Sequence, residues 1–569
     1  MTHSYPAAWF PQASQSTYAE AGYWVDETFA TWFDNRVVNF GEQNAVVGRS
    51  ARGTAWSLSY RELQSYAQQI AAHLQQAGLS PGDRAIVHFP NTIEFAGAVL
   101  GCFYAGVVPI FSVLAHAERD LAYFVHNAHA AAVLTVERFG LTDFRTRFTR
   151  IQEQGAALAA AGEFGETPDI TAFDATRGVF DVPKVQHIII PAPDGLDTTA
   201  VYKPVAGNSH DVAFMQLSGG TTGVPKLIAR SHVEYLYSVR ASATICELDT
   251  RSKMLAVMPA AHNFTMSSPG ILGVWHAGGA VYLHADPTPS SAFSLIAKEG
   301  ITFAPLVPPL LLSWLDAATK NLEKVRTQLA TLRFVQVGGA KLLPEVARRV
   351  APELGVAVQQ VFGMAEGLVC YTSLGDNEEH CTETQGRPLS PADEIRILDE
   401  LGNPVAPNTP GNLWTQGPYT IRGYVNGVDA ASFSDDGFYC TGDIVRQRRD
   451  GYLVVEGRAK DQINRAGEKI APDEVENVLL SFPGIRDAVV IGLPDSKLGE
   501  RSCAVLLGNP GDPHYGDTTG VRTRLRAAGL SAYKIPDDVV WQESLPATAV
   551  GKISRKELRR RLAQHLQAG

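Results

Sequence analysis

Strand and helix patterns alternate in the first part of the chain, and this alternation limits the choice of fold. Apolar residues recur at helical spacing over 60–77, and the Gly- and Pro-containing segment 78–82 marks the end of that helix. A strand over 84–89, a helix over 94–105 and a strand beginning near Gly106 follow. Strands joined through helices in this way lie parallel, with right-handed crossovers. The sequence therefore predicts an α/β fold with mostly parallel sheets.

The chain is long enough for at least two domains. Its 569 residues exceed what one hydrophobic core normally supports. Near the C-terminal end, a helix over 472–481, a strand over 487–493 and a helix over 520–528 form a short α+β stretch. We therefore predict a large domain over 1–459 and a small α+β domain over 460–569.

Two later apolar runs, 254–258 and 334–337, each end close to a candidate site motif. Ligands of open parallel α/β sheets bind outside the carboxyl ends of the strands. We therefore expect the residues that follow these runs to face a ligand.

The composition excludes several classes of protein. Hydrophobic residues make up 45% and charged residues 19%, which is typical of a globular enzyme and not of a disordered chain. The net charge of −10 argues against nucleic acid or an anionic membrane as the main partner. The chain has neither a signal-peptide pattern nor an apolar run of about 18 residues, so we expect no membrane association and a cytoplasmic location. The six cysteines form no C-x-x-C pair, which argues against a zinc site or a disulfide framework.

The segment LSGGTTGVPKL at 217–227 has the composition of a phosphate-binding loop. Its small residues expose backbone N–H groups, its hydroxyls offer hydrogen bonds, and Lys226 brings an ammonium, a combination that suits a nucleotide polyphosphate. The spacing differs from that of the usual P-loop, because Lys226 follows Val-Pro and precedes Leu227. A flexible surface loop is the alternative. The candidate phosphate-binding residues are Ser218, Gly219, Gly220, Thr221, Thr222 and Gly223.

Six further motifs follow this segment along the chain. They are His262-Asn263-Phe264, VFGMAEG at 361–367, YCTGD at 439–443, Gly457-Arg458, NRAGEK at 464–469 and the segment 546–552. Together with 217–227 they resemble the motifs of the adenylate-forming superfamily, which includes acyl-CoA synthetases, firefly luciferase and the adenylation domains of peptide synthetases. The resemblance covers nearly the whole chain. It implies ATP as the nucleotide and a small C-terminal domain that moves relative to a large N-terminal one.

Glu366 is the candidate magnesium ligand. It is an acidic residue in a glycine-flanked turn, and Mg²⁺ is normally held by few carboxylates together with phosphate oxygens and waters. On its own, Glu366 would be interpreted as a solvated loop glutamate. The resemblance implies the metal role.

Asp443 and Arg458 are the candidate ribose contacts. A carboxylate that follows a tight turn accepts hydrogen bonds from two ribose hydroxyls; an Asx-turn is the alternative, and the resemblance implies the ribose role. Gly338 and Gly339 lack bulk, which would let a flat adenine approach the backbone. The other residues that we expect to contact ATP are Gly338, Gly339, Ala340, Val361, Phe362 and Gly363.

Lys552 is the candidate catalytic lysine, together with His262 and Lys226. Alone, Lys552 would be interpreted as a surface lysine. The resemblance implies that it reaches from the small domain to the carboxylate of the substrate and to the α-phosphate. An ammonium at that place lowers the repulsion between two anionic reactants.

The resemblance also assigns a second face of the active site to the loop 464–469. Rotation of the small domain about Lys460 would exchange Lys552 for this loop, a hinge movement of the kind that gates many enzymes. An ordinary linker lysine is the alternative for Lys460. Ala466 is a departure, because many relatives have a glycine there.

Asn263 indicates the class of substrate. Amino-acid-activating relatives place an aspartate there to pair with an ammonium, whereas the neutral amide of Asn263 hydrogen-bonds a hydroxyl. The small side chains of Ser267 and Ser268 leave room for a ring. The pattern is most similar to the free-standing aryl-acid adenylating enzymes of catecholate siderophore pathways, the 2,3-dihydroxybenzoate–AMP ligases. The expected aryl-acid contacts are Asn263, Phe264, Ser268, Gly338, Val361 and Val369.

Two departures from that pattern leave the ring substitution open. Phe264 replaces the usual tyrosine, and Cys370 replaces the usual asparagine. Salicylate or another aryl acid is therefore an alternative substrate.

Three functions are compatible with the sequence. The first is an aryl-acid adenylating enzyme that loads the phosphopantetheine thiol of an aryl carrier protein. The second is an aryl- or acyl-CoA ligase of the same fold, although the sequence has no clear basic groove for the 3′-phosphate of CoA. The third is a nucleotide-binding protein without catalysis, and the presence of Glu366, Lys226 and Lys552 argues against it.

Overall fold

The computed structural model describes residues 10, 12–161, 185–196, 199–218, 226–425, 430–466, 468–495, 497–547 and 552–566. Within these residues the largest sheet has nine strands, in the order β17 (Arg387–Pro388), β16 (Val369–Tyr371), β15 (Ala357–Gly363), β14 (Phe334–Gly338), β13 (Phe303–Leu306), β11 (Lys253–Ala256), β12 (Ala280–Leu283), β1 (Asn44–Arg49) and β2 (Ala55–Ser59). The central strands run parallel, whereas β2, β16 and β17 pair antiparallel at the two edges.

A second sheet of the described chain has six strands. Their order is β10 (Lys226–Ser231), β9 (Val212–Ser218), β4 (Val108–Ser112), β3 (Arg84–His88), β5 (Ala132–Thr135) and β8 (Gln186–Ile189). All pairs are parallel except β9–β10. A short ribbon of β6 (Arg138–Phe139) and β7 (Thr142–Asp143) lies outside it.

The six-stranded sheet is buried on both faces. Alternate residues of β3 enter different cores, because successive side chains of a strand point to opposite faces: Ala85 and Val87 join one core, and Ile86 joins the other. The first core also contains residues of the nine-stranded sheet and of α2 (Phe29–Phe40), α3 (Tyr60–Gln76), α4 (Ile93–Ala105) and α9 (Gly270–Ala277). Every residue of α4 is buried, and the helix ends at Gly106, whose φ of 68° favours glycine.

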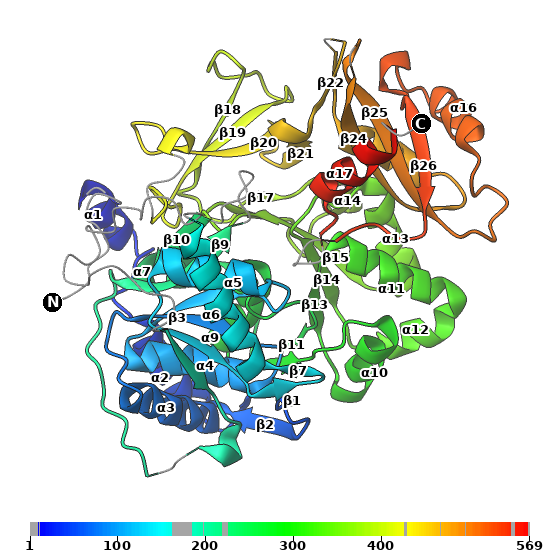
Figure 1. Cartoon of the computed structure of the whole chain (residues 1–569). Coiled ribbons are helices and arrows are strands. Elements are labelled where there is room, and N and C mark those ends of the chain that lie inside the picture. Colours follow the sequence, from blue (N-terminus) through cyan, green and yellow to red (C-terminus); the bar gives the residue numbers. More distant parts are fainter. Residues whose placement is uncertain are drawn as a thin grey trace.

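Further helices cover the remaining faces of the two large sheets (Figure 1). Residues of α5 (Glu118–Ala128) and α6 (Phe144–Ala160) pack in the second core of the six-stranded sheet. The outer face of the nine-stranded sheet is covered by α10 (Pro289–Glu299), α11 (Pro308–Lys320), α12 (Leu322–Gln328) and α13 (Pro344–Leu354). The other helices of this part are α1 (Gln12–Glu20), α7 (His232–Ile245), α8 (Asn263–Ser267) and α14 (Glu378–Glu383), with 3₁₀ turns η2 (Pro193–Gly195) and η3 (Ala430–Ser432).

Two smaller sheets follow in the chain. The first is antiparallel and consists of β18 (Glu394–Leu398), β19 (Gly411–Gln416), β20 (Tyr439–Gln447) and β21 (Leu453–Arg458). After η4 (Ala459–Asp461), the last sheet consists of β22 (Ile463–Arg465), β23 (Glu468–Ile470), β24 (Ile485–Asp495), β25 (Gly499–Gly508) and β26 (Asp538–Gln542). Its helices are α15 (Pro472–Leu480), α16 (Thr518–Ala527) and α17 (Arg555–Leu566), with the turn η5 (Ala532–Lys534).

The predicted α/β fold with mostly parallel sheets is confirmed. The helices and strands predicted over 60–110 correspond to α3, β3, α4 and β4. The two apolar runs that we expected to end near a site correspond to β11 and β14. In the C-terminal part, the predicted helices correspond to α15 and α16, and the predicted strand lies inside β24. Strands β25 and β26 were not anticipated. No helix of the described chain is long and apolar enough to cross a membrane.

The boundary between residues 459 and 460 stays a proposal, which the packing supports. The two cores around the last sheet take their described members from Ile463 onward. Figure 1 shows this part, in orange and red, grouped apart from the blue and cyan strands of the large sheets. The separate cores are what two domains require.

Close contact between α3 and α4 depends on two glycines. Gly97 and Gly101 of α4 face Tyr66 and Ile70 of α3, and a Cβ at position 97 would lie 2.2 Å from Tyr66 Cε1. We expect Gly97→Ala to lower the free energy of unfolding by about 1–3 kcal/mol, because a side chain must be displaced in a close-packed core.

Chemical denaturation monitored by circular dichroism measures this effect. Gly375→Ala is the matched control, because a Cβ at position 375 would have no neighbour within 4 Å. Equal stability of the two variants would contradict the packing argument.

Candidate active site

The chain has no side chains at the carboxyl end of β14, where two glycines follow each other. Gly338 pairs with Val361 of β15, and a Cβ at position 338 would lie 2.8 Å from the Val361 carbonyl oxygen and 3.0 Å from Phe264 Cζ. Gly339, with a φ of 81°, then turns the chain away from the sheet. Neighbouring protein groups thus occupy the space of a side chain at both positions, and the contact of Gly338 and Gly339 with adenine stays a prediction.

Lys552 reaches this edge from the C-terminal part of the chain. A Cβ at position 339 would lie only 3.1 Å from Lys552 Cε, so the lysine side chain lies directly against Gly339. Arg458, Asp443 and Glu366 are close enough to change its charge equilibrium. Burial, and then repulsion by Arg458, lower the pKa of Lys552 to about 8, while the two carboxylates oppose this change.

The segment that carries Lys552 is held by Arg555. Arg555 Nη1 donates to Glu476 Oε1 at 2.6 Å and to the Val490 carbonyl oxygen at 2.7 Å, and Nη2 pairs with Asp473 at 3.3 Å. Helix α15 and strand β24 therefore fix the chain three residues beyond the lysine.

His262 lies close enough to Lys552 to feel its charge. It begins α8, where its Nδ1 accepts the backbone N–H of Phe264 at 3.2 Å. Burial lowers the pKa of His262 to about 3, and the charge of Lys552 contributes to this shift. The imidazole is therefore neutral at pH 7, and it serves as a hydrogen-bonding group and not as a cation.

Asp443 is a buried carboxylate with one unsatisfied oxygen. Arg458 Nε lies 2.7 Å from its Oδ1, whereas Oδ2 is buried without a hydrogen-bond partner in the described part of the chain. Burial raises the pKa of Asp443, and Arg458 opposes the rise. An unpaired buried acceptor costs about 1–3 kcal/mol, which a donating hydroxyl of a ligand would relieve. This geometry fits the ribose role expected for Asp443.

Glu366 and Lys226 are connected through Tyr424. The Tyr424 hydroxyl donates to Glu366 Oε1 at 3.0 Å and lies 3.1 Å from the Tyr439 hydroxyl. The ammonium of Lys226 lies 4.6 Å from the centroid of the Tyr424 ring, which is a cation–π distance. The buried carboxylate and the first residue of β10 therefore share one tyrosine.

The protein groups around Glu366 suit only a metal ion whose other ligands come from the substrate and from water. Among the described residues, no group of three or more His, Cys, Asp or Glu side chains is arranged to hold an ion. Mg²⁺ fits a single carboxylate when phosphate oxygens and waters supply the other positions.

Asn263 is oriented by two neighbours. Its Oδ1 accepts hydrogen bonds from Gln216 Nε2 at 2.5 Å and from the Tyr235 hydroxyl at 2.6 Å. Tyr235 also contacts the Ser267 hydroxyl. Because the carbonyl side of the amide is used in this way, Nδ2 of Asn263 is the group that can donate to a ligand.

The remaining expected aryl contacts form an apolar wall. Phe264, Val361 and Val369 belong to one core together with Tyr371. The Tyr371 hydroxyl bonds to the side chains of Ser242, at 3.0 Å, and Ser268. Ser268 therefore contributes to the site through Tyr371.

The expectation that Cys370 bears on the ring substitution was wrong. Cys370 packs with Leu368 and Leu413 on the opposite face of β16 from Val369, because neighbouring residues of a strand point to opposite sides. It does not border the aryl-acid wall and does not bear on the ring substitution. Phe362 is half-buried and packs against this second cluster, and its contact with ATP stays a prediction.

The other predicted residues lie as follows. Gly219, Gly220, Thr221, Thr222 and Gly223 lie outside the described residues, and Ser218 ends β9 opposite Lys226 of β10. Ala340 is exposed.

Lys460 lies in η4 between two residues that are tied to different parts of the molecule. Arg458 pairs with Asp443 of β20 at 2.7 Å, whereas Asp461 accepts a hydrogen bond from Arg559 of α17 at 3.1 Å. A hinge residue must lie between two such anchored points, as Lys460 does. The hinge role of Lys460 stays a prediction.

Sequence reasoning missed the residues that orient the expected ones. Gln216 and Tyr235 are 47 and 28 positions from Asn263, and Tyr424 is 58 positions from Glu366. No local motif connects partners at such separations. The only sequence signal is that Gln216 and Tyr235 flank the phosphate-loop segment.

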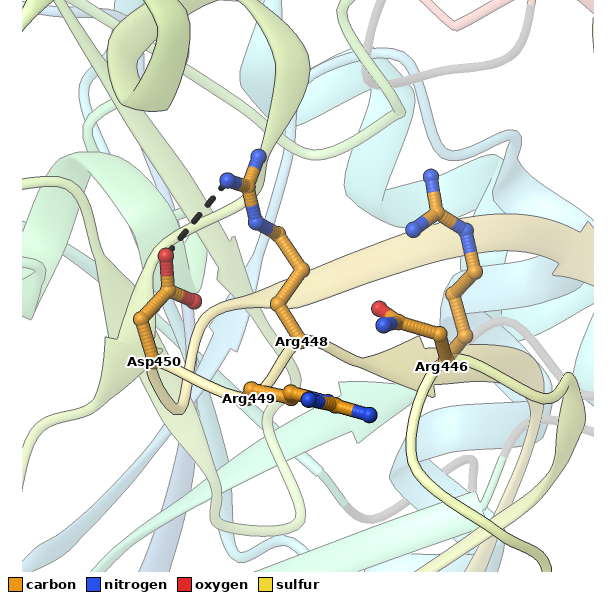
Figure 2. A pocket seen from close by; sticks show the side chains of 5 residues that line it. Arg446, Arg448, Arg449 and Asp450 are labelled. Carbon is orange, nitrogen blue, oxygen red and sulfur yellow. Dashed lines mark ion pairs between the residues drawn. The ribbon is translucent and has the colours of Figure 1, made fainter.

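A basic hollow lies on another face of β20. Arg446 pairs with Glu456 at 2.6 Å, and Arg448 pairs with Glu379 at 2.7 Å and with Asp450 at 3.5 Å. Figure 2 shows Arg448 turned toward Asp450, with Arg449 pointing away. The residues that line this hollow are Asn408, Arg446, Arg448, Arg449 and Asp450. Two of the three guanidinium charges are thus balanced within the protein.

We expect Lys552 to titrate near pH 8 in the free protein, as a neutral amine above this value and an ammonium below it. Arg458→Met removes a repelling charge and should raise the pKa, whereas Asp443→Asn removes an attracting charge and should lower it. The pH dependence of acetylation by acetic anhydride, followed by peptide mass spectrometry, measures both shifts. The exposed Lys497 in the same digest controls for reagent reactivity. Identical Lys552 profiles in all three proteins would contradict the arrangement.

Comparison with known proteins agrees with this geometry. Residues 33–425 match the family described as AMP-binding enzyme, and residues 474–552 match the AMP-binding enzyme C-terminal domain. The chain is 43% identical to a 2,3-dihydroxybenzoate-AMP ligase of Bacillus subtilis, covering 98% of each chain. It is 40% identical to a salicylyl-CoA synthase / salicylate adenylyltransferase of a Streptomyces species, covering 97% of this chain and 96% of that protein.

A solved structure supports the same assignment. The apo structure of MbtA from Mycobacterium smegmatis is 37% identical, covers 98% of both chains and has a TM-score of 0.66. The chain therefore belongs to the AMP-binding enzymes, the adenylate-forming superfamily that its motifs resemble.

Proposed function

We propose that this protein activates an aryl carboxylic acid with ATP, giving an aryl-adenylate and pyrophosphate. It then transfers the aryl group to the phosphopantetheine thiol of an aryl carrier protein in siderophore biosynthesis, in the cytoplasm. The observation that carries the proposal is the position of Lys552 against Gly339, with Asp443, Arg458 and Glu366 close to its ammonium. These groups meet the needs of an anionic nucleotide and an anionic acid at one strand edge.

In the first half-reaction, a carboxylate oxygen of the acid attacks the α-phosphorus of ATP, and the bond to pyrophosphate breaks. Lys552 lowers the repulsion between the two anions, and Asp443 accepts hydrogen bonds from the ribose hydroxyls. Glu366 would hold Mg²⁺, which when bound neutralises part of the phosphate charge. Lys552 lies inward in this structure, which suits this half-reaction.

In the second half-reaction, the thiol sulfur attacks the acyl carbon, AMP leaves and the thiol proton is released. We assign the second face to the β22–β23 hairpin, reached by rotation about Lys460. Ala466 in this hairpin has a φ of 52°, the left-handed conformation that explains why glycine suits the position.

We propose 2,3-dihydroxybenzoate as the substrate. The amide Nδ2 of Asn263 is a donor for the hydroxyl oxygen next to the carboxylate on the ring, and the 43% identical relative bears the name 2,3-dihydroxybenzoate-AMP ligase. Salicylate shares the neighbouring hydroxyl, and the 40% identical relative is named for it. It is the alternative substrate, since Asn263 addresses a group that both acids carry.

CoA is the alternative acceptor. A CoA ligase would need cationic groups to bind the 3′-phosphate of CoA. In the described part of the chain, the basic hollow around Arg449 is the candidate for such a site. Because Arg446 and Arg448 are already paired, this hollow favours CoA only weakly.

The direct test is ATP–pyrophosphate exchange with a panel of benzoic acids, followed by thioester assays with CoA or an aryl carrier protein. We expect the fastest exchange with 2,3-dihydroxybenzoate and thioester formation on the carrier protein. Exchange with no aryl acid would refute the function, and preference for CoA would refute the acceptor.

Asn263→Asp should raise the KM for the aryl acid about 10- to 100-fold. Asp keeps the acceptor for Gln216 and Tyr235 but replaces the donor with a charged acceptor, a loss of about 1–3 kcal/mol. The KM for ATP should change much less. Asn208→Asp, at an exposed turn, is the matched control. Equal changes in both KM values would exclude Asn263 from the aryl site.

Lys552→Ala should slow formation of the aryl-adenylate by roughly 10²–10³-fold, the scale of removing one positioned donor. Transfer from supplied aryl-adenylate to the thiol should be nearly unchanged, because Lys552 serves only the first half-reaction. Single-turnover assays of each half-reaction measure the two rates separately. Equal losses in both would contradict the two-conformation proposal.

A further inference from the structure

We propose that Arg230 is a positioning residue that holds the Glu366 loop and, through Tyr235, the amide of Asn263. The inference deepens the proposed function and rests on it for the roles of Glu366 and Asn263. Arg230 contacts no expected ligand atom; it acts through the groups that do.

Arg230 ties the Glu366 loop to β10. Its side chain is 2% exposed, and it donates from Nη1 to the Ala365 carbonyl oxygen at 2.6 Å and from Nη2 to the Tyr419 carbonyl oxygen at 2.7 Å. Ala365 directly precedes Glu366, whose own carbonyl oxygen accepts the N–H of Ile421 at 2.8 Å. The two segments that enclose the carboxylate are therefore joined by one guanidinium.

The charge of Arg230 is balanced inside the protein. Glu234 of α7 is 0% exposed and lies 3.2 Å from Arg230 Nε. Its Oε1 also accepts the N–H of Ser231 at 2.9 Å, which fixes the start of the helix. A buried pair of this kind adds little net stability, so a positional role explains it better than a stabilising one.

One face of the Arg230 guanidinium lies over the ring of Tyr235, which contacts the expected aryl-acid residue Asn263. Arg230 Cζ lies 4.9 Å from the centroid of the Tyr235 ring, and the Tyr235 hydroxyl donates to Asn263 Oδ1 at 2.6 Å. The ring position therefore sets where the Asn263 amide points.

One side of β10 faces the Glu366 region. Lys226, Ile228 and Arg230 alternate along the strand, so their side chains share a face. Lys226 lies over Tyr424, Ile228 packs with Tyr424 and Ile421, and Arg230 bonds to Ala365. The strand that begins at the candidate phosphate lysine thus also positions the candidate metal carboxylate.

Arginine is required for this arrangement. Its planar fork reaches two carbonyls and a carboxylate in fixed directions while its face stacks on a ring, whereas a lysine ammonium is a point charge without a face. A lysine at position 230 would keep the charge balance with Glu234 but not the geometry.

The test compares three proteins. Arg230→Lys keeps the charge, and Arg230→Met combined with Glu234→Gln removes both charges without leaving one unpaired. Arg147→Met is the matched control, because Arg147 also donates to two carbonyls, those of Leu114 and His116, and pairs with a glutamate away from the site.

Four readouts separate positioning from folding. They are thermal unfolding, calorimetric binding of ATP at varied Mg²⁺, calorimetric binding of the aryl acid, and pyrophosphate exchange. We expect both Arg230 proteins to fold and to lose about 10- to 100-fold in Mg²⁺-dependent ATP affinity and in aryl-acid affinity, the usual scale for groups that orient a ligand-binding residue. Arg147→Met should lower the unfolding temperature without either loss.

Two results would overturn the proposal: unchanged affinities in Arg230→Lys, or the same affinity losses in Arg147→Met. Failure of exchange in the wild-type protein refutes the proposed function instead. In that event, ATP binding at varied Mg²⁺ still decides whether Arg230 positions Glu366.

Discussion

Lys552 carries a positive charge into a part of the molecule from which water is largely excluded. Burial disfavours the ammonium, Arg458 repels it, and Asp443 and Glu366 attract it. Its pKa of about 8 reflects this balance before any ligand is present. A polyphosphate would add several negative charges at short range and would hold the lysine firmly in its charged form. The arrangement around the strand edge, from the glycines to the carboxylates, accommodates this one ammonium.

The strand edge serves three neighbours at once. Gly338 leaves room for the carbonyl of Val361 and the ring of Phe264, and Gly339 leaves room for Lys552. A side chain at either position would collide with a group on which the site depends. The two glycines are therefore a packing requirement of the protein itself.

The sequence was sufficient for the fold and for residues in local motifs, because periodicity and short motifs report on neighbours in the chain. Asp443, Glu366 and Lys552 lie in such motifs, whose resemblance to a family singled them out, and the structure places them near one another. It could not supply Gln216, Tyr235, Tyr424 or Arg230, since each acts on a partner brought close only by the folded sheets. It also could not say which way a strand residue points, and this is why Cys370 was wrongly linked to the ring.

The turn η4 has a consequence for how the C-terminal part would move. Arg458 is bound to Asp443 on one side, and Asp461 is bound to Arg559 on the other, so only Ala459 and Lys460 lie between the two anchored points. Each residue offers two soft backbone torsions, and a joint this short permits swinging about a narrow range of axes but little sliding. Lys552 and the β22–β23 hairpin both lie beyond the joint in the chain. When one of them is turned toward the strand edge, the other would be turned away, and the sequence of chemical steps would follow from the mechanics of a single swivel.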